Sequence, residues 1–103
     1  MKKYNVELLP AAYSDLDAIF DYILVDNPRA AVKMLDRIMQ ALHRLEEFPL
    51  SGSPLIDHSI KNFRMVIVDP YIAFYRFIDN KVYVYRVIHG ARNYRHLLKD
   101  TTK

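Results

Sequence analysis

The spacing of hydrophobic residues changes twice along the chain. Near the start, Tyr4, Val6 and Leu8 alternate with other residues before Pro10, which predicts a short first strand. The apolar residues that follow recur every three or four positions, the period of a helix with one buried face. They are Leu16, Ile19, Phe20, Ile23 and Leu24. The chain therefore passes from a strand to an amphipathic helix.

Helix boundaries can be predicted from the capping residues. The first helix begins either at a capping pair formed by Ser14 and Asp17 or earlier, directly after Pro10. A second helix begins at Asn27-Pro28, because asparagine caps well and proline is tolerated in the first turn. Its apolar residues are Ala31, Leu35, Ile38, Leu42 and Leu45. So short a connection predicts an antiparallel helical hairpin, followed by a loop over 48–55.

The last third of the chain has the composition of strands. Segments 63–68, 71–78 and 81–88 are rich in β-branched and aromatic residues, and the turn sequences Asp69-Pro70 and Asp79-Asn80 separate them. They predict an antiparallel meander. The predicted fold class is α+β in the order βααβββ, with the helical hairpin packed on one face of a mainly antiparallel sheet. We expect one domain over 1–103 that ends in a basic tail, 90–103.

Alternation along these strands predicts two sheet faces that are both mostly apolar. The face toward the helices would carry Arg64, Val66, Val68, Tyr71, Ala73, Tyr75, Phe77, Val82, Val84, Arg86 and Ile88. The opposite face would carry Phe63, Met65, Ile67, Ile72, Phe74, Arg76, Tyr83, Tyr85, Val87 and His89. A β-bulge would break this partition. Since two helices cover one face, we expect the face with Phe74, Tyr83 and Tyr85 to be open or covered by a partner protein.

Composition narrows the class of protein. The chain has 103 residues, 51% of them hydrophobic, and no cysteine, so it can bury one core without disulfides or thiolate metal sites. No apolar run approaches the roughly 18 residues that span a bilayer. The N-terminus lacks the apolar region of a signal peptide, so we expect a cytoplasmic protein with no membrane partner.

Charge is distributed unevenly about a net value of +3. Residues 11–48 hold seven acids and four bases, whereas residues 81–103 hold six bases and one acid. The basic end would attract an anionic partner, either a nucleic acid or an acidic polypeptide.

Several polar residues are candidates for a site. Arg86, on the helix side, is expected to pair with a carboxylate of the first helix, Asp17 or Asp21, because an unpaired buried guanidinium is costly. His89, Arg92 and Tyr94 have the chemistry for metal-independent RNA cleavage, which needs a base, a cation and an acid. The competing interpretation is that these basic residues are solvated or hold a partner. The histidines are His43, His58, His89 and His96, and they lack ligand spacing, so we expect no metal and no cofactor.

Three segments together carry a family resemblance. They are AAYSDLDAIFDYI in the first helix, the FPxxG turn after the second, and RVIHGARNY after the last strand. With the order of elements, they make the chain resemble the RelE/ParE superfamily of toxins from bacterial type II toxin–antitoxin modules. The resemblance implies a small toxin that a cognate antitoxin neutralises, in a toxin–antitoxin hetero-oligomer. Its antitoxin-binding residues would be Phe74, Arg76, Tyr83, Tyr85, Arg92 and Arg95.

The superfamily divides by target, and the residues favour one branch. RelE-like members are nucleases that cleave mRNA on the ribosome, and ParE-like members poison DNA gyrase without being enzymes. A nuclease of this kind carries a phosphate-binding arginine where this chain has Ile72, and lysines where it has Phe63 and Met65. Of the residues that such nucleases use, this chain keeps the arginine after Gly90, as Arg92. Tyr94 corresponds to an aromatic residue of the nuclease tail, but it does not have the RelE spacing. We therefore predict a ParE-like gyrase inhibitor, with a metal-independent endoribonuclease as the alternative and a non-toxic binding module as a third possibility.

Overall fold

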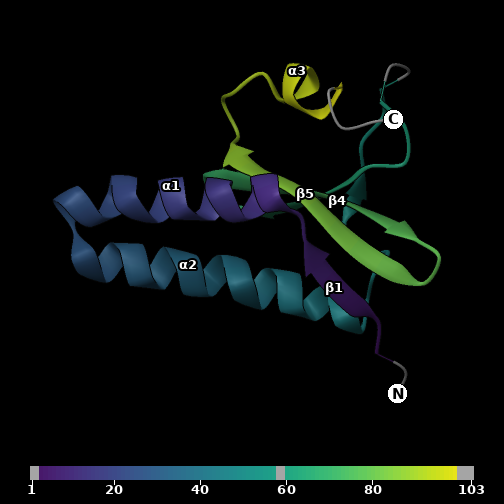
Figure 1. The fold of residues 1–103 in the computed structure, drawn as a ribbon, viewed down its shortest axis with the longest axis horizontal. Helices are drawn as coiled ribbons and strands as arrows, with labels where there is room; N and C mark the ends of the chain where they lie inside the picture. Colours follow the sequence, from purple (N-terminus) through teal and green to yellow (C-terminus); the bar gives the residue numbers. More distant parts are fainter. Residues whose placement is uncertain (1–2, 58–59, 100–103) are drawn as a thin grey trace.

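The computed structural model describes residues 3–57 and 60–99, so the predicted basic tail lies partly outside the described residues. The elements are strand β1 (Asn5–Leu8), helices α1 (Pro10–Asp26) and α2 (Pro28–His43), the 3-10 turn η1 (Arg44–Glu46), strands β2 (Ser53–Pro54), β3 (Arg64–Val68), β4 (Tyr71–Ile78) and β5 (Lys81–His89), and helix α3 (Tyr94–Lys99) (Figure 1). The predicted α+β class and the order of its six main elements are confirmed. Strand β2 and helix α3 are additions.

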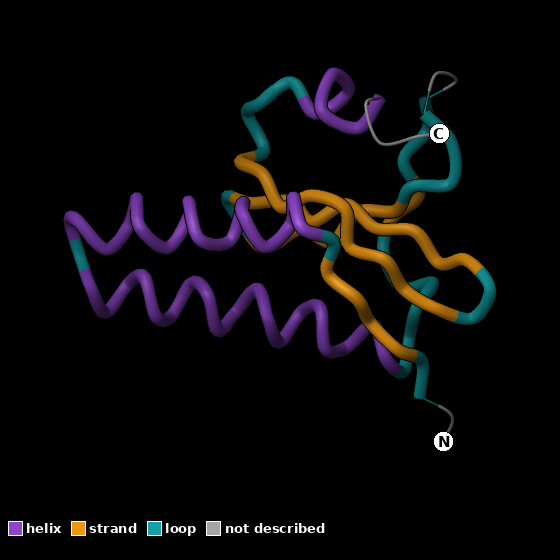
Figure 2. Tube along the Cα trace, viewed as in Figure 1, coloured by secondary structure: helices purple, strands orange, loops and turns teal. Residues whose placement is uncertain are grey.

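The sheet has the strand order β1-β5-β4-β3-β2. Strand β1 pairs with β5 in parallel, and all other neighbours are antiparallel. The hairpin of α1 and α2 packs on the sheet and projects beyond the strands at its closed end (Figure 2). The N-terminal strand and the C-terminal meander thus form one sheet that carries the helices.

Both helix starts follow from local chemistry. Helix α1 begins directly at Pro10, with Leu9 as its N-cap and no side-chain capping bond, so the earlier of the two expected starts is correct. In α2 the Asn27 side chain accepts a hydrogen bond from the Ala30 N–H at 3.1 Å, as expected for an asparagine cap. The two caps leave one residue between the helices and force the antiparallel hairpin.

A β-bulge in β5 changes which residues share a face. Tyr75 pairs with Val84, but Phe74 pairs with Arg86, so one extra residue of β5 stands between these pairs. Beyond it, the predicted faces are exchanged. Val87 packs in the cluster under the helices and Ile88 in the cluster on the other side, the reverse of the prediction.

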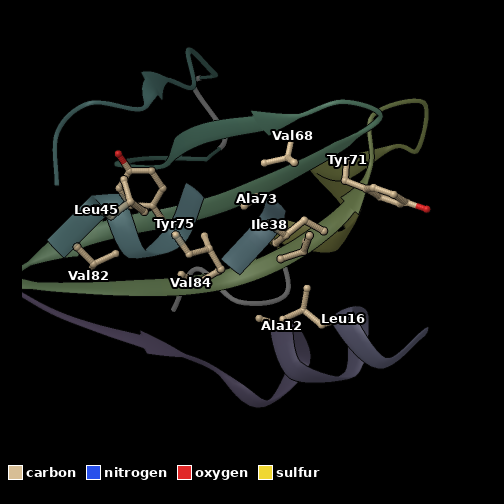
Figure 3. Close-up of a cluster of buried hydrophobic side chains, with 12 residues drawn as sticks. Ala12, Leu16, Ile38, Leu45, Val68, Tyr71, Ala73, Tyr75, Val82 and Val84 are labelled. Atoms are coloured by element: carbon tan, nitrogen blue, oxygen red, sulfur yellow. The ribbon is translucent and has the colours of Figure 1, made fainter. Parts of the chain in front are cut away.

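The larger core lies between the helical hairpin and the sheet (Figure 3). Its buried members are Ala12, Leu16, Ile38, Leu42, Leu45, Val68, Tyr71, Ala73, Tyr75, Val82, Val84 and Val87. We call this set the helix-side core. It contains Leu16 of the stripe predicted for α1, with Ile19 and Ile23 packed against it, and Ile38, Leu42 and Leu45 of the second predicted stripe. Leu24, also predicted to be buried, is 40% exposed, so the stripe of α1 is confirmed only in part.

The opposite face of the sheet is covered by the chain itself. Phe74 is completely buried there, in a second cluster with Ile60, Phe63, Ile88 and Leu98. We call this set the outer core. Its cover comes from Leu55, Ile60 and Phe63 and from α3, which lies across the sheet from α2 (Figure 1). The prediction of an open face at Phe74 and Tyr85 is therefore wrong.

Tyr75 ties the loop after α2 to the helix-side core. Its ring is fully buried, its hydroxyl donates to the Pro49 carbonyl at 2.8 Å, and it accepts from the Gly52 N–H at 2.9 Å. A Cβ on Gly52 would lie 2.6 Å from that hydroxyl oxygen, so glycine allows the close approach. Arg64 adds bonds from Nη1 to the carbonyls of Leu50, at 3.2 Å, and Gly52, at 2.8 Å.

Removing the Tyr75 hydroxyl is therefore expected to destabilise the fold. Tyr75→Phe leaves a buried N–H and a buried carbonyl without their partner, which costs about 1–3 kcal/mol of unfolding free energy. Chemical denaturation measures the change. Tyr83→Phe, on a half-buried ring, is the matched control and should stay within about 0.5 kcal/mol. Equal effects of the two substitutions would contradict the role given to the Tyr75 hydroxyl.

The same hydroxyl makes stability depend on alkaline pH. Burial raises the pKa of Tyr75 above its ordinary value, against smaller opposing effects from the Gly52 hydrogen bond and Arg64. A folded-state pKa above the unfolded one gives stability that is complete below about pH 10 and is lost as the pH rises through the folded pKa. The unfolding free energy of Tyr75→Phe should accordingly fall less steeply above pH 10 than that of the wild type. Parallel curves would contradict this.

Candidate functional site

A cleft of about 450 Å³ opens where the end of β5 meets α1 and the turn before β4. Its lining residues are Asp15, Ala18, Ile19, Tyr22, Pro70, Tyr71, Val87, Ile88, His89 and Arg92. Two of the predicted site residues, His89 and Arg92, lie here. The lining residues Asp15, Tyr22 and Tyr71 were not singled out from the sequence, because the bulge that turns the end of β5 toward α1 has no marker in the residue pattern.

Asp15 and Arg86 form the ion pair beside this cleft. The Arg86 Nε and Nη2 atoms donate to the two Asp15 oxygens at 2.7 and 2.8 Å, and the Val87 N–H donates to the same carboxylate at 2.9 Å. The hydrogen bond to Asp15 raises the pKa of Arg86, and burial opposes this only in part. The guanidinium is therefore held in its charged form and in one orientation.

The partner of Arg86 is Asp15 rather than the expected Asp17 or Asp21. Strand β1 ends at Leu8, opposite Val84, so beyond that point the edge of β5 has no neighbouring strand. Asp15 occupies this gap and accepts the Val87 N–H, whereas Asp17 is exposed on α1. Arg86 pairs with Asp15 because this carboxylate can accept hydrogen bonds from both the guanidinium and the unpaired Val87 N–H at the edge of β5.

The last residue of β5, His89, and Arg92 in the turn after it both line the cleft. The His89 ring packs edge-on against Tyr71, with 5.7 Å between ring centroids, and its Nδ1 accepts the Ala91 N–H at 3.1 Å. The Gly90 N–H bonds to the Pro70 carbonyl at 2.8 Å, and the Arg92 N–H to the His89 carbonyl at 3.0 Å. The histidine is thus fixed by the backbone, and the Arg92 side chain is exposed.

Tyr71 closes the inner end of the cleft. It is 7% exposed, and its hydroxyl points away from Ala73 and Val84 (Figure 3). Burial, followed by the neighbouring Tyr22, raises the pKa of Tyr71, so the phenol stays neutral. This neutral hydroxyl offers a hydrogen-bond donor or acceptor in a cleft that Arg92 also lines.

Tyr94, the third residue of the predicted catalytic set, lies in a different environment. Its ring stacks on Phe74, with centroids 5.1 Å apart, and it is half-buried against the outer core. His89, in contrast, contacts Tyr71 of the helix-side core. The structure brings His89 and Arg92 together but not Tyr94.

The residues predicted to bind an antitoxin have partners within the chain. The Arg76 guanidinium lies 4.2 Å from the Phe63 ring centroid and 5.2 Å from that of Tyr85, and its Nη2 donates to the Lys61 carbonyl at 3.1 Å. Arg95 pairs with Asp57 at 2.7 Å, which links α3 to the residues that follow β2. Phe74 is buried and Arg76, Tyr83 and Tyr85 are half-buried, so Arg92 and Arg95 are the exposed members of this set.

The described part of the chain carries neither a cluster of metal ligands nor a membrane-spanning helix. Over residues 3–57 and 60–99, no three histidine or carboxylate side chains gather as metal ligands would. None of the described helices is long and apolar enough to cross a membrane. His58, one of the four histidines, lies outside the described residues.

The comparison with protein families identifies this arrangement of strands, hairpin and cleft. The family model described as the ParE toxin of the type II toxin–antitoxin system parDE matches residues 6–94, most of the chain. The chain belongs to this family. It is therefore a RelE/ParE superfamily toxin, as the resemblance in its sequence implied.

Two curated relatives of this ParE-family chain are also named as toxins. Toxin RelE2 of Caulobacter vibrioides is 37% identical over 79% of this chain and 89% of its own length. Putative toxin Y4kP of Sinorhizobium fredii is 35% identical over 95% of this chain and all of its own length. The names of the relatives thus include the RelE branch, although the family model is that of ParE.

Solved structures share the fold with this ParE-family chain. The chromosomal ParDE system of P. aeruginosa matches with a TM-score of 0.73 and 21% identity, over 84% of this chain and 96% of that one. A double mutant of E. coli toxin RelE in the free state matches with a TM-score of 0.68 and 12% identity, over 96% of each chain. The RelBE2 complex of Mycobacterium tuberculosis matches with a TM-score of 0.61 and 24% identity, over 84% of this chain and 98% of that one. At these identities the likeness establishes the fold alone.

Proposed function

We propose that this toxin acts as a ParE-like inhibitor of DNA gyrase, without being an enzyme, and that a cognate antitoxin neutralises it. One observation carries the proposal. The positions at which, by the resemblance, RelE-like nucleases place their cations hold Phe63, Met65 and Ile72, which lie in or against the outer core. Cationic donors that stabilise a transition state contribute several kcal/mol each, about 2.7–4 for a typical hydrogen-bond donor, so their loss severely weakens phosphate chemistry.

The remaining polar residues support the same proposal. RNA cleavage needs a base that can take a proton and an acid that can give one, within reach of one phosphate. The Nδ1 of His89 is engaged by the Ala91 N–H, and the Tyr94 ring is stacked on Phe74. Arg92 alone remains as an exposed cation of the set, and one cation suits binding better than cleavage.

Antitoxin binding in the cytoplasm is the second part of the proposal. The related structures of P. aeruginosa and M. tuberculosis are described as a toxin–antitoxin system and a toxin–antitoxin complex. By analogy we assign this chain a cognate antitoxin as its partner. The reading frame beside its gene is the place to look for that antitoxin.

Purified gyrase tests the proposal. We expect the toxin to inhibit ATP-dependent supercoiling of relaxed plasmid and to raise the amount of cleaved DNA trapped with gyrase. Ribosome-bound mRNA should stay intact under the same conditions. Unchanged supercoiling, with no accumulated cleavage, would contradict gyrase as the target.

The alternative is a RelE-like ribosome-dependent mRNA endoribonuclease. It is favoured by the relative named RelE2 and by the cleft that joins His89 and Arg92. If it holds, mRNA on the ribosome is cut in the presence of the toxin, and the double substitution His89→Ala with Arg92→Ala abolishes the cutting. Cutting that survives the double substitution would remove these residues from the mechanism.

A further inference from the structure

Helix α2 presents a row of cations to solvent. Arg29, Lys33 and Arg37 of this helix and its C-cap residue, Arg44, are all exposed. At about 100° per residue they fall within an arc of about 80° around the helix axis, and at about 1.5 Å per residue the row is about 22 Å long. We call this set the cationic row. It forms a line of positive charge along one side of the helix.

The cationic row differs from four other arginines of the chain in having no ion-pair partner among the described residues. Arg64 and Arg76 donate to backbone carbonyls, and Arg86 and Arg95 pair with carboxylates. Three members of the row stand at four-residue spacing, where like charges destabilise a helix. Arg29 also lies at the N-terminal end of α2, where the helix dipole is positive. An anion from outside the chain would relieve this repulsion.

The acidic residues of the hairpin lie mostly on the other helix. Helix α1 carries four aspartates and no base, whereas α2 carries one acid, Asp36, which accepts a hydrogen bond from Gln40 at 3.1 Å. Helix α1 packs on β5 and α2 on β3, and Arg44 lines a groove with Val66 and Ile67 of β3. The fold thus divides a segment that is acidic as a whole into an acidic helix and a basic one, and the row turns toward β3.

A line of charge of one sign matches the backbone of duplex DNA better than it matches a compact anion. Arg29, Lys33 and Arg37 follow one another at intervals of about 6 Å. The phosphates of one DNA strand advance by about 3.4 Å along the duplex axis per base pair. Long, flexible side chains at this spacing can each reach a phosphate, and such contacts position a protein on DNA without reading its sequence. Duplex DNA is also what the proposed target, gyrase, binds.

We propose that the cationic row contacts the phosphate backbone of the DNA duplex bound to gyrase. The inference rests on the proposed function, because it takes gyrase as the target. The toxin then contacts nucleic acid as well as protein, and this second contact helps to keep cleaved DNA trapped with the enzyme. Because the contact depends on charge, it is independent of base sequence and weakens as salt is added.

The test measures binding of the intact toxin to a fluorescent duplex oligonucleotide, by anisotropy at several salt concentrations and without gyrase. For the wild type, the logarithm of the affinity should fall linearly with the logarithm of the salt concentration. The variant Arg29→Gln/Lys33→Gln/Arg37→Gln should make this slope shallower by about 0.9 for each cation removed and weaken binding by on the order of tenfold or more. In a supercoiling reaction the same variant should trap less cleaved DNA with gyrase.

Two controls separate the effect of charge from other effects of the substitutions. Arg29→Lys/Arg37→Lys keeps both charges and should keep the slope, because a phosphate contact requires a cation. Lys33→Gln alone is matched by Lys61→Gln, which makes the same change at an exposed lysine ahead of β3. Only Lys33→Gln should change the slope. Thermal unfolding establishes that each variant is folded.

The outcomes separate this inference from the proposed function. A shallower slope and less trapped DNA for the triple variant, with both controls unaffected, support it. No binding of the wild type to the duplex, or a slope or an amount of trapped DNA that the triple variant leaves unchanged, overturns it and leaves gyrase as the target. Polyglutamate that binds the wild type as tightly as the duplex at the same salt concentration would assign the cationic row to acidic polypeptides and also overturn it. Supercoiling that the wild type leaves unchanged overturns the proposed function together with this inference.

Discussion

Replacing Asp15 by alanine is expected to lower the free energy of unfolding by about 3–5 kcal/mol, because it leaves a buried cation without its partner. The Arg86 and Asp15 side chains are 17% and 11% exposed, so water can replace the lost hydrogen bonds only in part. The Val87 N–H loses its acceptor in the same step. Urea denaturation monitored by circular dichroism measures the effect.

Asp17→Ala is the matched control for this prediction. Asp17 is an exposed aspartate on the same helix and should change stability by less than about 0.5 kcal/mol. The double variant Asp15→Ala/Arg86→Leu should recover part of the loss, since replacing both partners by apolar groups removes the uncompensated charge. A small effect of Asp15→Ala, close to that of Asp17→Ala, would show that the pair does not hold β5 to α1.

Phe74→Ala is expected to destabilise the protein by a similar amount, about 3–5 kcal/mol, through a cavity in the outer core. Phe74 is completely buried and stacks with Tyr94 of α3. An open binding face would give the opposite result, namely a stability close to that of the wild type and weaker binding of a partner. The substitution therefore distinguishes a closed core from a docking surface.

Ile67→Ala is the control for Phe74→Ala. Ile67 lies on the neighbouring strand β3 and is 65% exposed, so its truncation should cost less than about 0.5 kcal/mol. Thermal unfolding by calorimetry gives both values. If Phe74→Ala proves as mild as Ile67→Ala, then α3 does not seal this face.

Local patterns were sufficient to predict the main elements of the fold. The 3.6-residue periods that predict the two helices, the Asn27 cap and the two hairpin turns depend on residues close together in sequence, and the structure confirms these elements. Asp79 and Asn80, for example, both adopt positive φ, at 52° and 62°, as the tight turn between β4 and β5 requires. Such elements can be predicted from a few neighbouring residues, without knowing how distant parts of the chain pack.

The bulge in β5 was not predictable from these patterns. Both Tyr85 and Arg86 are compatible with a regular strand, and only the pairing with Phe74 and Tyr75 shows that one residue is extra. Because each strand residue alternates in direction, one extra residue exchanges the faces of Val87 and Ile88. The neighbourhood of His89 was predicted incorrectly for the same reason.

The sequence analysis did not predict what covers the outer core, because two leucines lie in a segment that is otherwise rich in basic residues. The segment after Gly90 was interpreted as a basic tail, yet Leu97 and Leu98 within it pack on the outer core. Ile60 adds to the cover, and among the described residues it pairs only through an isolated bridge with Asp57 and lies in none of the predicted strands. Helices α1 and α2 cover only one face of the sheet, and the short helix α3 with residues ahead of β3 buries the other.

The order in which cellular processes stop tests the central claim, that this toxin acts on gyrase, most directly. Induction of this chain alone, with incorporation of labelled thymidine and methionine followed in parallel, should show DNA synthesis falling before protein synthesis. Co-expression of the adjacent reading frame should restore growth. Protein synthesis falling first, with mRNA cut on the ribosome, would contradict the claim, as would growth that continues undisturbed.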